Sequence, residues 1–185
     1  IHSPQYKVYF HIIGDFFSPR EREEYMSIIK ENHLAPYVIL HGRQAGQMLD
    51  LLFELCDFGI GSLGRHRSGI TNIKTLKNRE YAARGIPFIY SEIDEDFENM
   101  PYIMKIPANE EAVDIKQILN FYNQLHITPL EIRNSIRHLS WNNQMKKVLD
   151  EMQKKDKINP NNNNIANFAT LYTNKFIPNK EKWPH

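Results

Sequence analysis

The sequence predicts an α/β fold built on a parallel, doubly wound sheet with helices on both of its faces. Short apolar runs rich in β-branched and aromatic residues alternate along the chain with longer segments of helical periodicity. That alternation is typical of right-handed crossovers between parallel strands. With 185 residues, 41% of them hydrophobic and 24% charged, the chain is large enough to form one sizeable core.

The first part of the chain predicts two buried strands, each followed by a helix. Residues 6–14 form the first strand, and Gly14 and Asp15 end it. The helix that follows has Ser18 as its N-cap and Pro19 at its first position. Residues 37–42 form the second strand. The next helix places four apolar residues on one face: Met48, Leu49, Leu52 and Leu55.

The second part continues the alternation and then becomes helical. We expect short strands over residues 58–62 and 87–91, separated by a basic loop and a helix that begins near Leu76. Residues 102–107 form a fifth strand at an edge of the sheet. Helical patterns then cover residues 115–124, 129–139 and 141 to about 154.

The composition changes near residue 157 and divides the chain. Residues 1–156 are expected to form the folded domain, and residues 157–185 an Asn-rich linker and an aromatic tail. The sequence begins with Ile1 instead of Met and opens almost directly into a strand. We therefore expect it to be part of a longer protein.

Charge and cysteine content exclude several classes of protein. A formal net charge of +1 provides no general attraction to nucleic acid, so any anion site must be local. The lone Cys56 excludes an internal disulfide framework and fits a reducing compartment. No apolar run approaches the roughly 18 residues needed to span a bilayer, and the histidines lack metal-binding spacing.

Ligands of open parallel sheets bind beyond the carboxyl ends of the strands, where glycines and cations of this chain should meet. Cations and backbone amides there suit a diphosphate, and a carboxylate suits the hydroxyl groups of a diol. The alternative is that these charges form a solvated rim. The predicted site residues are Gly14, Gly42, Arg43, Ser62, Arg65, Arg67, Leu76, Lys77 and Glu80.

The three glycines Gly59, Gly61 and Gly64 have the G-x-G-x-x-G spacing of dinucleotide-binding proteins. That fingerprint needs a strand directly before the first glycine and a helix that opens through the third. Here a helical pattern precedes the motif and a polar loop follows it. We therefore expect no NAD site.

Three segments, "VILHG", "CDFGIGSLG" and "LKNREYAARGIPFIYS", together resemble the C-terminal, donor-binding domain of GT-B glycosyltransferases, close to family 4. The resemblance covers roughly residues 6–155. It implies a Rossmann-like domain, the C-terminal half of a GT-B fold, that binds a nucleoside-diphosphate sugar. By this resemblance Glu80 accepts hydrogen bonds from the donor ribose, and Gly42 and Arg43 line the base. Leu76 and Lys77 mark the helix start that faces the diphosphate.

The resemblance has one departure that concerns the sugar. The family often carries a second glutamate, which contacts the transferred sugar, and Asn72 occupies that place here. The implied activity is transfer of the sugar to an unknown acceptor, in surface polysaccharide synthesis, without a metal or other cofactor. No catalytic residue is assigned.

The resemblance also implies a partner and a location. The acceptor would be bound by an N-terminal domain of the same protein, so this chain alone should transfer nothing. The expected location is the cytoplasm, with peripheral association at the inner face of the membrane as an alternative. Two other functions stay open, a sugar-nucleotide epimerase or hydrolase of the same fold and a non-catalytic binding module.

Overall fold

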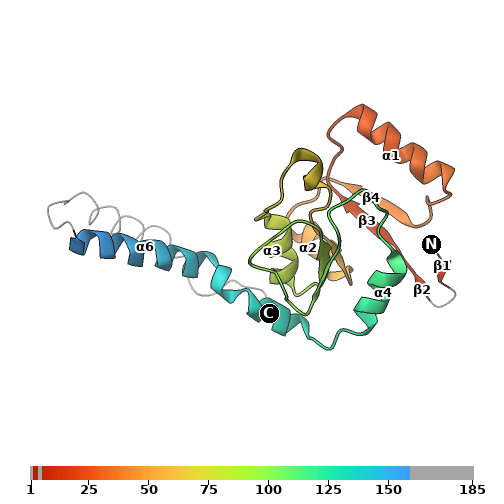
Figure 1. Ribbon diagram of the computed structural model, residues 1–185. Helices are drawn as coiled ribbons and strands as arrows, with labels where there is room; N and C mark the ends of the chain where they lie inside the picture. The colour runs from red at the N-terminus through yellow and green to blue at the C-terminus, as the bar shows by residue number, and fades with distance from the viewer. Residues whose placement is uncertain (1, 4–5, 159–185) are drawn as a thin grey trace. The chain divides into compact units, whose positions relative to one another are not determined.

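The computed structural model describes residues 2–3 and 6–158, and side chains over residues 6–154. It is a mixed α/β structure in which parallel sheets alternate with helices (Figure 1). Contacts within the chain divide it into two units, Ile1–Ile132 and Arg133–His185. The sheets lie in the first unit. The tail predicted over residues 157–185 falls outside the described residues, apart from the end of one helix.

The first two long strands form a parallel pair. Strand β3 (Phe10–Ile13) leads into helix α1 (Pro19–Glu31), and β4 (Val38–Gly42) follows and pairs with β3. Helix α1 begins as predicted, because the Ser18 hydroxyl accepts a hydrogen bond from the backbone N–H of Glu21 at 3.1 Å. The βαβ unit predicted here is therefore confirmed.

The predicted strand over residues 6–14 is divided in the structure. Its start, β2 (Tyr6–Lys7), pairs in antiparallel fashion with β1 (His2–Ser3), and only β3 joins the parallel pair. The prediction of two buried strands was also wrong. The residues of β3 and β4 are half-buried or exposed, because their sheet contains only two strands and both outer edges are open.

A second parallel sheet has the order β5-β6-β7 and holds most of the core. Its strands are β5 (Gly59–Ile60), β6 (Phe88–Tyr90) and β7 (Ile103–Lys105). All three residues of β6 are inaccessible to solvent, as are Phe97 and Tyr102 on the segment that leads to β7. Among the described residues no ladder joins this sheet to β3 and β4, so the single continuous sheet that we predicted is not observed.

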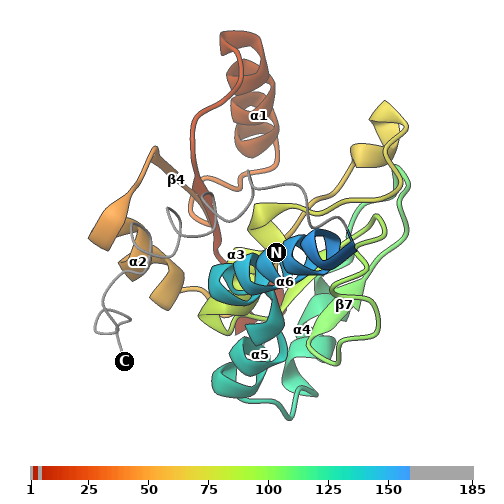
Figure 2. The ribbon, with the colours of Figure 1, turned by 90° about the vertical axis from the view of Figure 1, so that its left-hand side faces the viewer.

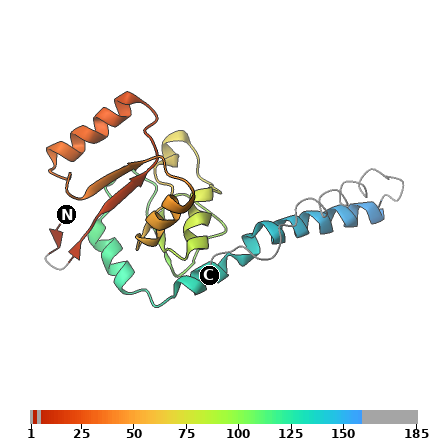
Figure 3. The same ribbon diagram turned by 180° about the vertical axis from the view of Figure 1, so that it is seen from behind.

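Helices α2 (Gly46–Glu54) and α3 (Leu76–Arg84) precede and follow β5, and they lie side by side (Figure 3). Arg84 of α3 pairs with Asp50 of α2 at 2.7 Å, and its guanidinium lies 4.1 Å from the ring centre of Phe53. Gly85 ends α3 in the left-handed conformation, with φ of +77°. Helix α4 (Ile115–Asn123) follows the second sheet.

The C-terminal elements depart slightly from prediction. The helix predicted over residues 129–139 is α5 (Pro129–Ser135) followed by the 3₁₀ turn η2 (Arg137–Leu139). Helix α6 (Trp141–Ile158) is longer than expected. Near its start, the side chains of Asn143 and Gln144 donate hydrogen bonds to carbonyls of η2. Within the described ranges no helix is long and apolar enough to cross a membrane.

Candidate anion site at the start of helix α3

The carboxyl ends of β3 and β4 bring together three of the predicted residues. The backbone N–H of Gly14 donates to the carbonyl of Gly42 at 2.8 Å, and both residues have positive φ, +128° and +64°. Arg43 pairs with Asp15 at 2.6 Å, and both side chains are exposed. This edge thus has close-lying glycines as predicted, but its one arginine is already paired with a carboxylate.

Ser62 follows β5 and is buried, and it joins β5 to the neighbouring strand. Its carbonyl accepts hydrogen bonds from the backbone N–H of Ser91 at 3.2 Å and from the Ser91 hydroxyl at 3.4 Å. Ser91 follows β6 directly. The backbone of Ser62 therefore fixes the start of the basic loop against the second sheet.

The basic loop forms a 3₁₀ turn, η1 (Arg65–Ser68), whose backbone amides face an internal carboxylate. The buried Glu92 accepts a hydrogen bond from the N–H of His66 at 3.1 Å. Burial raises the pKa of Glu92, but hydrogen bonds from Ser91 and from the amides of Glu92, His66 and Arg65 outweigh this and leave the pKa below its usual value. Sequence reasoning missed Glu92, although the acidic run "SEIDEDFE" after β6 contains it.

Arg67 is also engaged within the chain. Its Nε donates to Glu110 Oε1 at 2.8 Å and its Nη2 donates to Oε2, while His66 Nε2 lies 3.0 Å from Oε1. The hydrogen bonds from Arg67, and then from His66, lower the pKa of Glu110 to about 2. In Figure 2 the turn η1 and the segment before α4, which carries Glu110, lie side by side.

The N-terminus of α3 combines free amides with unbalanced positive charge. Its N-cap Thr75 makes no capping hydrogen bond, and the Thr75 hydroxyl oxygen is buried without a partner. Desolvation lowers the pKa of Lys77 in the first turn, and the positive charge of Arg65 lowers it further. Neither cation forms an ion pair with a described residue, and the first turn of α3 contains no acid. Lys77 thus lies at the positive end of a helix dipole and within the electrostatic range of a second positive charge.

The other charges of α3 hold the helix in place. Arg79 donates to both carboxylate oxygens of the fully buried Asp94, at 3.2 Å each, and also pairs with Asp96. Glu80 pairs with Arg84 one turn later at 3.2 Å, and its side chain is 45% exposed. Sequence reasoning missed the buried pair of Arg79 with Asp94, because the two residues belong to different segments.

The glycine motif has a packing explanation. A Cβ atom placed on Gly59 would lie 2.7 Å from the ring of Tyr81, and one on Gly61 would lie 2.6 Å from Asn78 Oδ1. Both neighbours belong to α3. The first two glycines therefore allow α3 to pack closely on β5, and the motif needs no dinucleotide to account for it.

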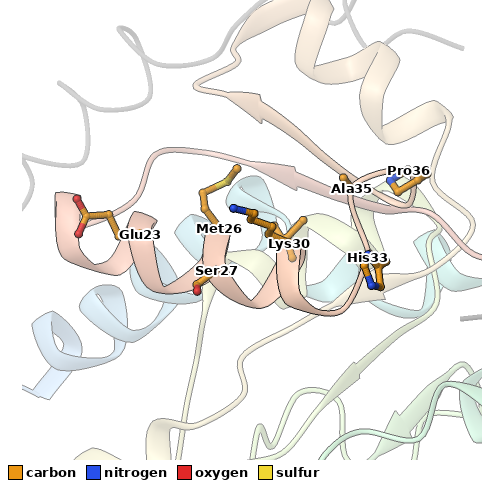
Figure 4. A pocket seen from close by; sticks show the side chains of 8 residues that line it. Glu23, Met26, Ser27, Lys30, His33, Ala35 and Pro36 are labelled. Carbon is orange, nitrogen blue, oxygen red and sulfur yellow. The ribbon is translucent and has the colours of Figure 1, made fainter.

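Two pockets among the described residues bear on the candidate site. One of about 250 Å³ lies beside η1 and the ends of β6 and β7. It is lined by Leu63, Gly64, His66, Arg67, Ser91, Ile106, Pro107, Asn109, Glu110, Glu111 and Val113. A larger pocket of about 730 Å³ runs along α1 and the turn after it (Figure 4), and none of the nine predicted site residues lines it.

The predicted residues thus form distinct groups, and one group is suited to an anionic ligand. Gly14, Gly42 and Arg43 lie at the first sheet, whereas Lys77 lies in the first turn of α3, which Leu76 begins, and the charge of Arg65 acts on it. The described residues hold no cluster of three or more His, Cys, Asp or Glu side chains that could bind a metal. No family model matches the sequence, and neither a curated protein nor a solved structure matches it.

Proposed function

We propose that this chain is the donor-binding part of a GT-B glycosyltransferase and that it binds a nucleoside-diphosphate sugar at the start of α3. The single observation that carries the proposal is that Lys77, at an uncapped helix N-terminus, and Arg65, whose charge acts on Lys77, form no side-chain ion pair with a described residue. A diphosphate carries the charge that this arrangement lacks. An anion at a helix N-terminus is stabilised by about 0.3–1 kcal/mol from the dipole alone, and by more where amides and cations also donate hydrogen bonds.

The fold supports the proposal in two general respects, the parallel strand–helix–strand units and the position of the α3 N-terminus. The units β3-α1-β4 and β5-α3-β6 are both parallel, as in the two halves of a Rossmann-like domain. Helix α3 starts after β5 and ends before β6, so its N-terminus lies on the side of the carboxyl ends of the second sheet. Ligands of open parallel sheets bind on that side.

Glu80 is the residue proposed to accept hydrogen bonds from the ribose. It lies one turn after the helix start, on an exposed part of α3. Its partner Arg84 also pairs with Asp50, so that arginine keeps a carboxylate if Glu80 turns to a ligand. Glu80 can therefore leave Arg84 and bind a ribose without leaving that arginine unpaired.

The chemistry proposed for the longer protein is electrostatic. Arg65, Lys77 and the amides of α3 would stabilise the departing diphosphate as negative charge develops on it. No metal and no catalytic base is part of the proposal. Sugar transfer would also need an acceptor domain, because proximity in such a cleft supplies roughly 7–11 kcal/mol of the barrier.

A second function, that of a non-catalytic nucleotide-binding module, is favoured by one residue. Asn72 replaces the carboxylate that would contact the sugar, and its side chain donates to the Thr71 hydroxyl at 3.2 Å. A module of this kind would bind the nucleotide without processing the sugar.

Calorimetry tests the proposal directly. The 185-residue chain is titrated with UDP, GDP, their sugar conjugates and the free sugars. We expect nucleoside diphosphates to bind, their sugar conjugates to bind with similar affinity, and free sugars not to bind. A free sugar that bound as tightly as a nucleoside diphosphate would overturn the assignment. A donor-hydrolysis assay on the longer protein then separates the transferase from the module.

A further inference from the structure

We propose that His66 and Arg67 form a second anion-binding group beside the cations of α3, and that Glu110 occupies this group as an internal competitor of the ligand. The inference rests on the proposed function, because it concerns the phosphate groups of the same nucleotide. It adds His66 as a ligand contact, gives the predicted residue Arg67 a defined role and assigns a regulatory role to Glu110. In this account the free chain holds Glu110 where a phosphoryl group binds in the complex.

The geometry around Glu110 is that of a recognised anion. Arg67 contacts both oxygens of the carboxylate through Nε and Nη2, and His66 Nε2 approaches Oε1 at 3.0 Å. Three donors from two adjacent residues therefore converge on a single anionic group. A bidentate arginine with a neighbouring donor binds phosphate as well as carboxylate, because both present oxygens at matching positions.

The backbone that carries the donors is anchored. The N–H of His66 is held by the buried Glu92 at 3.1 Å, and the N–H of Arg67 donates to the Gly64 carbonyl at 3.2 Å. The side chains of Arg67 and Glu110 are both exposed, and Glu110 lies on a segment that is neither helix nor strand. Replacing Glu110 by a ligand would therefore leave the backbone bonds of η1 in place.

The adjoining pocket sets the size of the group that can enter. Its volume of about 250 Å³ is below the roughly 300–1,000 Å³ of pockets that enclose whole drug-sized ligands. A phosphoryl group fits there, but a complete nucleoside-diphosphate sugar does not. Because Arg65 is next to His66 in η1 and acts electrostatically on Lys77, one diphosphate could contact both groups of cations.

Glu110 is charged at all physiological pH values, because its pKa lies near 2. It therefore competes continuously with an anionic ligand for Arg67 and His66. A ligand whose binding site is open only part of the time has its apparent affinity reduced by the open fraction. Removing the charge of Glu110 should then strengthen binding, which is the opposite of what a structural ion pair predicts.

Calorimetry with inorganic pyrophosphate and with UDP tests this on the full chain. The variants are Glu110→Gln, the double variant Glu110→Gln/Arg67→Gln, and the control Glu24→Gln. Glu24 pairs with the exposed Arg20 at 3.0 Å and does not line this pocket. We expect Glu110→Gln to bind both probes about five-fold more tightly or better, Glu24→Gln to bind like the unchanged chain, and the double variant to lose the gain.

An affinity of Glu110→Gln equal to or below that of the unchanged chain would overturn the inference while leaving the proposed function intact. Absence of binding by every variant would overturn both. A second measurement does not depend on how well the variant folds. In the unchanged chain, ¹³C NMR should show the pKa of Glu110 rising from about 2 when pyrophosphate saturates the protein, and an unchanged titration would contradict displacement.

Discussion

Arg65 and Lys77 carry like charges in separate segments of the chain, and each lies within the electrostatic reach of the other. Desolvation lowers the pKa of Lys77, and the charge of Arg65 lowers it further. Folded proteins usually place carboxylates near such charges, as this chain does for Arg43, Arg67 and Arg79. The pair near α3 is therefore the place where an anion from outside would relieve repulsion.

The depressed pKa of Lys77 predicts a pH-dependent affinity. Lys77 loses its charge as pH rises through this lowered pKa. The affinity for pyrophosphate should therefore begin to fall at a pH lower than the ordinary lysine pKa of about 10.4. A bound anion favours the charged form, and binding in this range should therefore take up protons. Calorimetry at alkaline pH in two buffers of different ionisation enthalpy measures the uptake. Lys77→Arg should show neither effect, and identical pH profiles would contradict the role of Lys77.

Glu80 should contribute to binding only when the ligand contains a ribose. Glu80→Gln is expected to weaken UDP binding by about 1.5–3 kcal/mol, the range for hydrogen bonds to a charged group, and to leave pyrophosphate binding unchanged. Glu24→Gln is the matched control, because it removes an exposed carboxylate that pairs with an arginine one helical turn away, as Glu80 does. Equal losses in the two variants, or equal losses for the two ligands, would contradict a ribose contact by Glu80.

Arg79 should be required for stability and not for ligand binding. Arg79→Met leaves the fully buried Asp94 without its cation, and breaking a buried pair in this way costs about 3–5 kcal/mol. The control Arg20→Met removes an exposed pair with Glu24, whose expected contribution is below about 1 kcal/mol. Urea unfolding of both variants measures the difference, and similar losses would show that Asp94 is not held chiefly by Arg79.

Local features of the fold could be predicted from the sequence because neighbouring residues determine them. The Ser18 cap and the start of α3 at Leu76 both appear where predicted. The meeting of Gly14 with Gly42 also follows from parallel strands that end at the same edge. In each case the feature is determined by residues close in sequence or by two consecutive strands joined by one helix.

Features that depend on distant partners could not be predicted. Arg67 pairs with Glu110, 43 positions further along the chain, and Glu92 accepts the N–H of His66 from 26 positions away. No local periodicity records such pairings. The separation of the parallel strands into two sheets among the described residues could not be predicted either. Pairing between strands that are not consecutive does not alter the hydrophobic pattern of either strand.

The most direct test of the account removes the unbalanced charge near α3. The double variant Arg65→Gln/Lys77→Gln is compared with Arg20→Gln/Lys154→Gln, which loses the same charge from residues that are already paired with carboxylates and that lie outside the predicted site. Calorimetry with UDP at low salt is the measurement. We predict that the control variant binds like the unchanged chain and that the test variant loses on the order of 100-fold in affinity, as expected when charge-assisted hydrogen bonds are lost. UDP binding by the test variant as tight as that by the control would contradict the proposal that a nucleotide diphosphate lies at the start of α3.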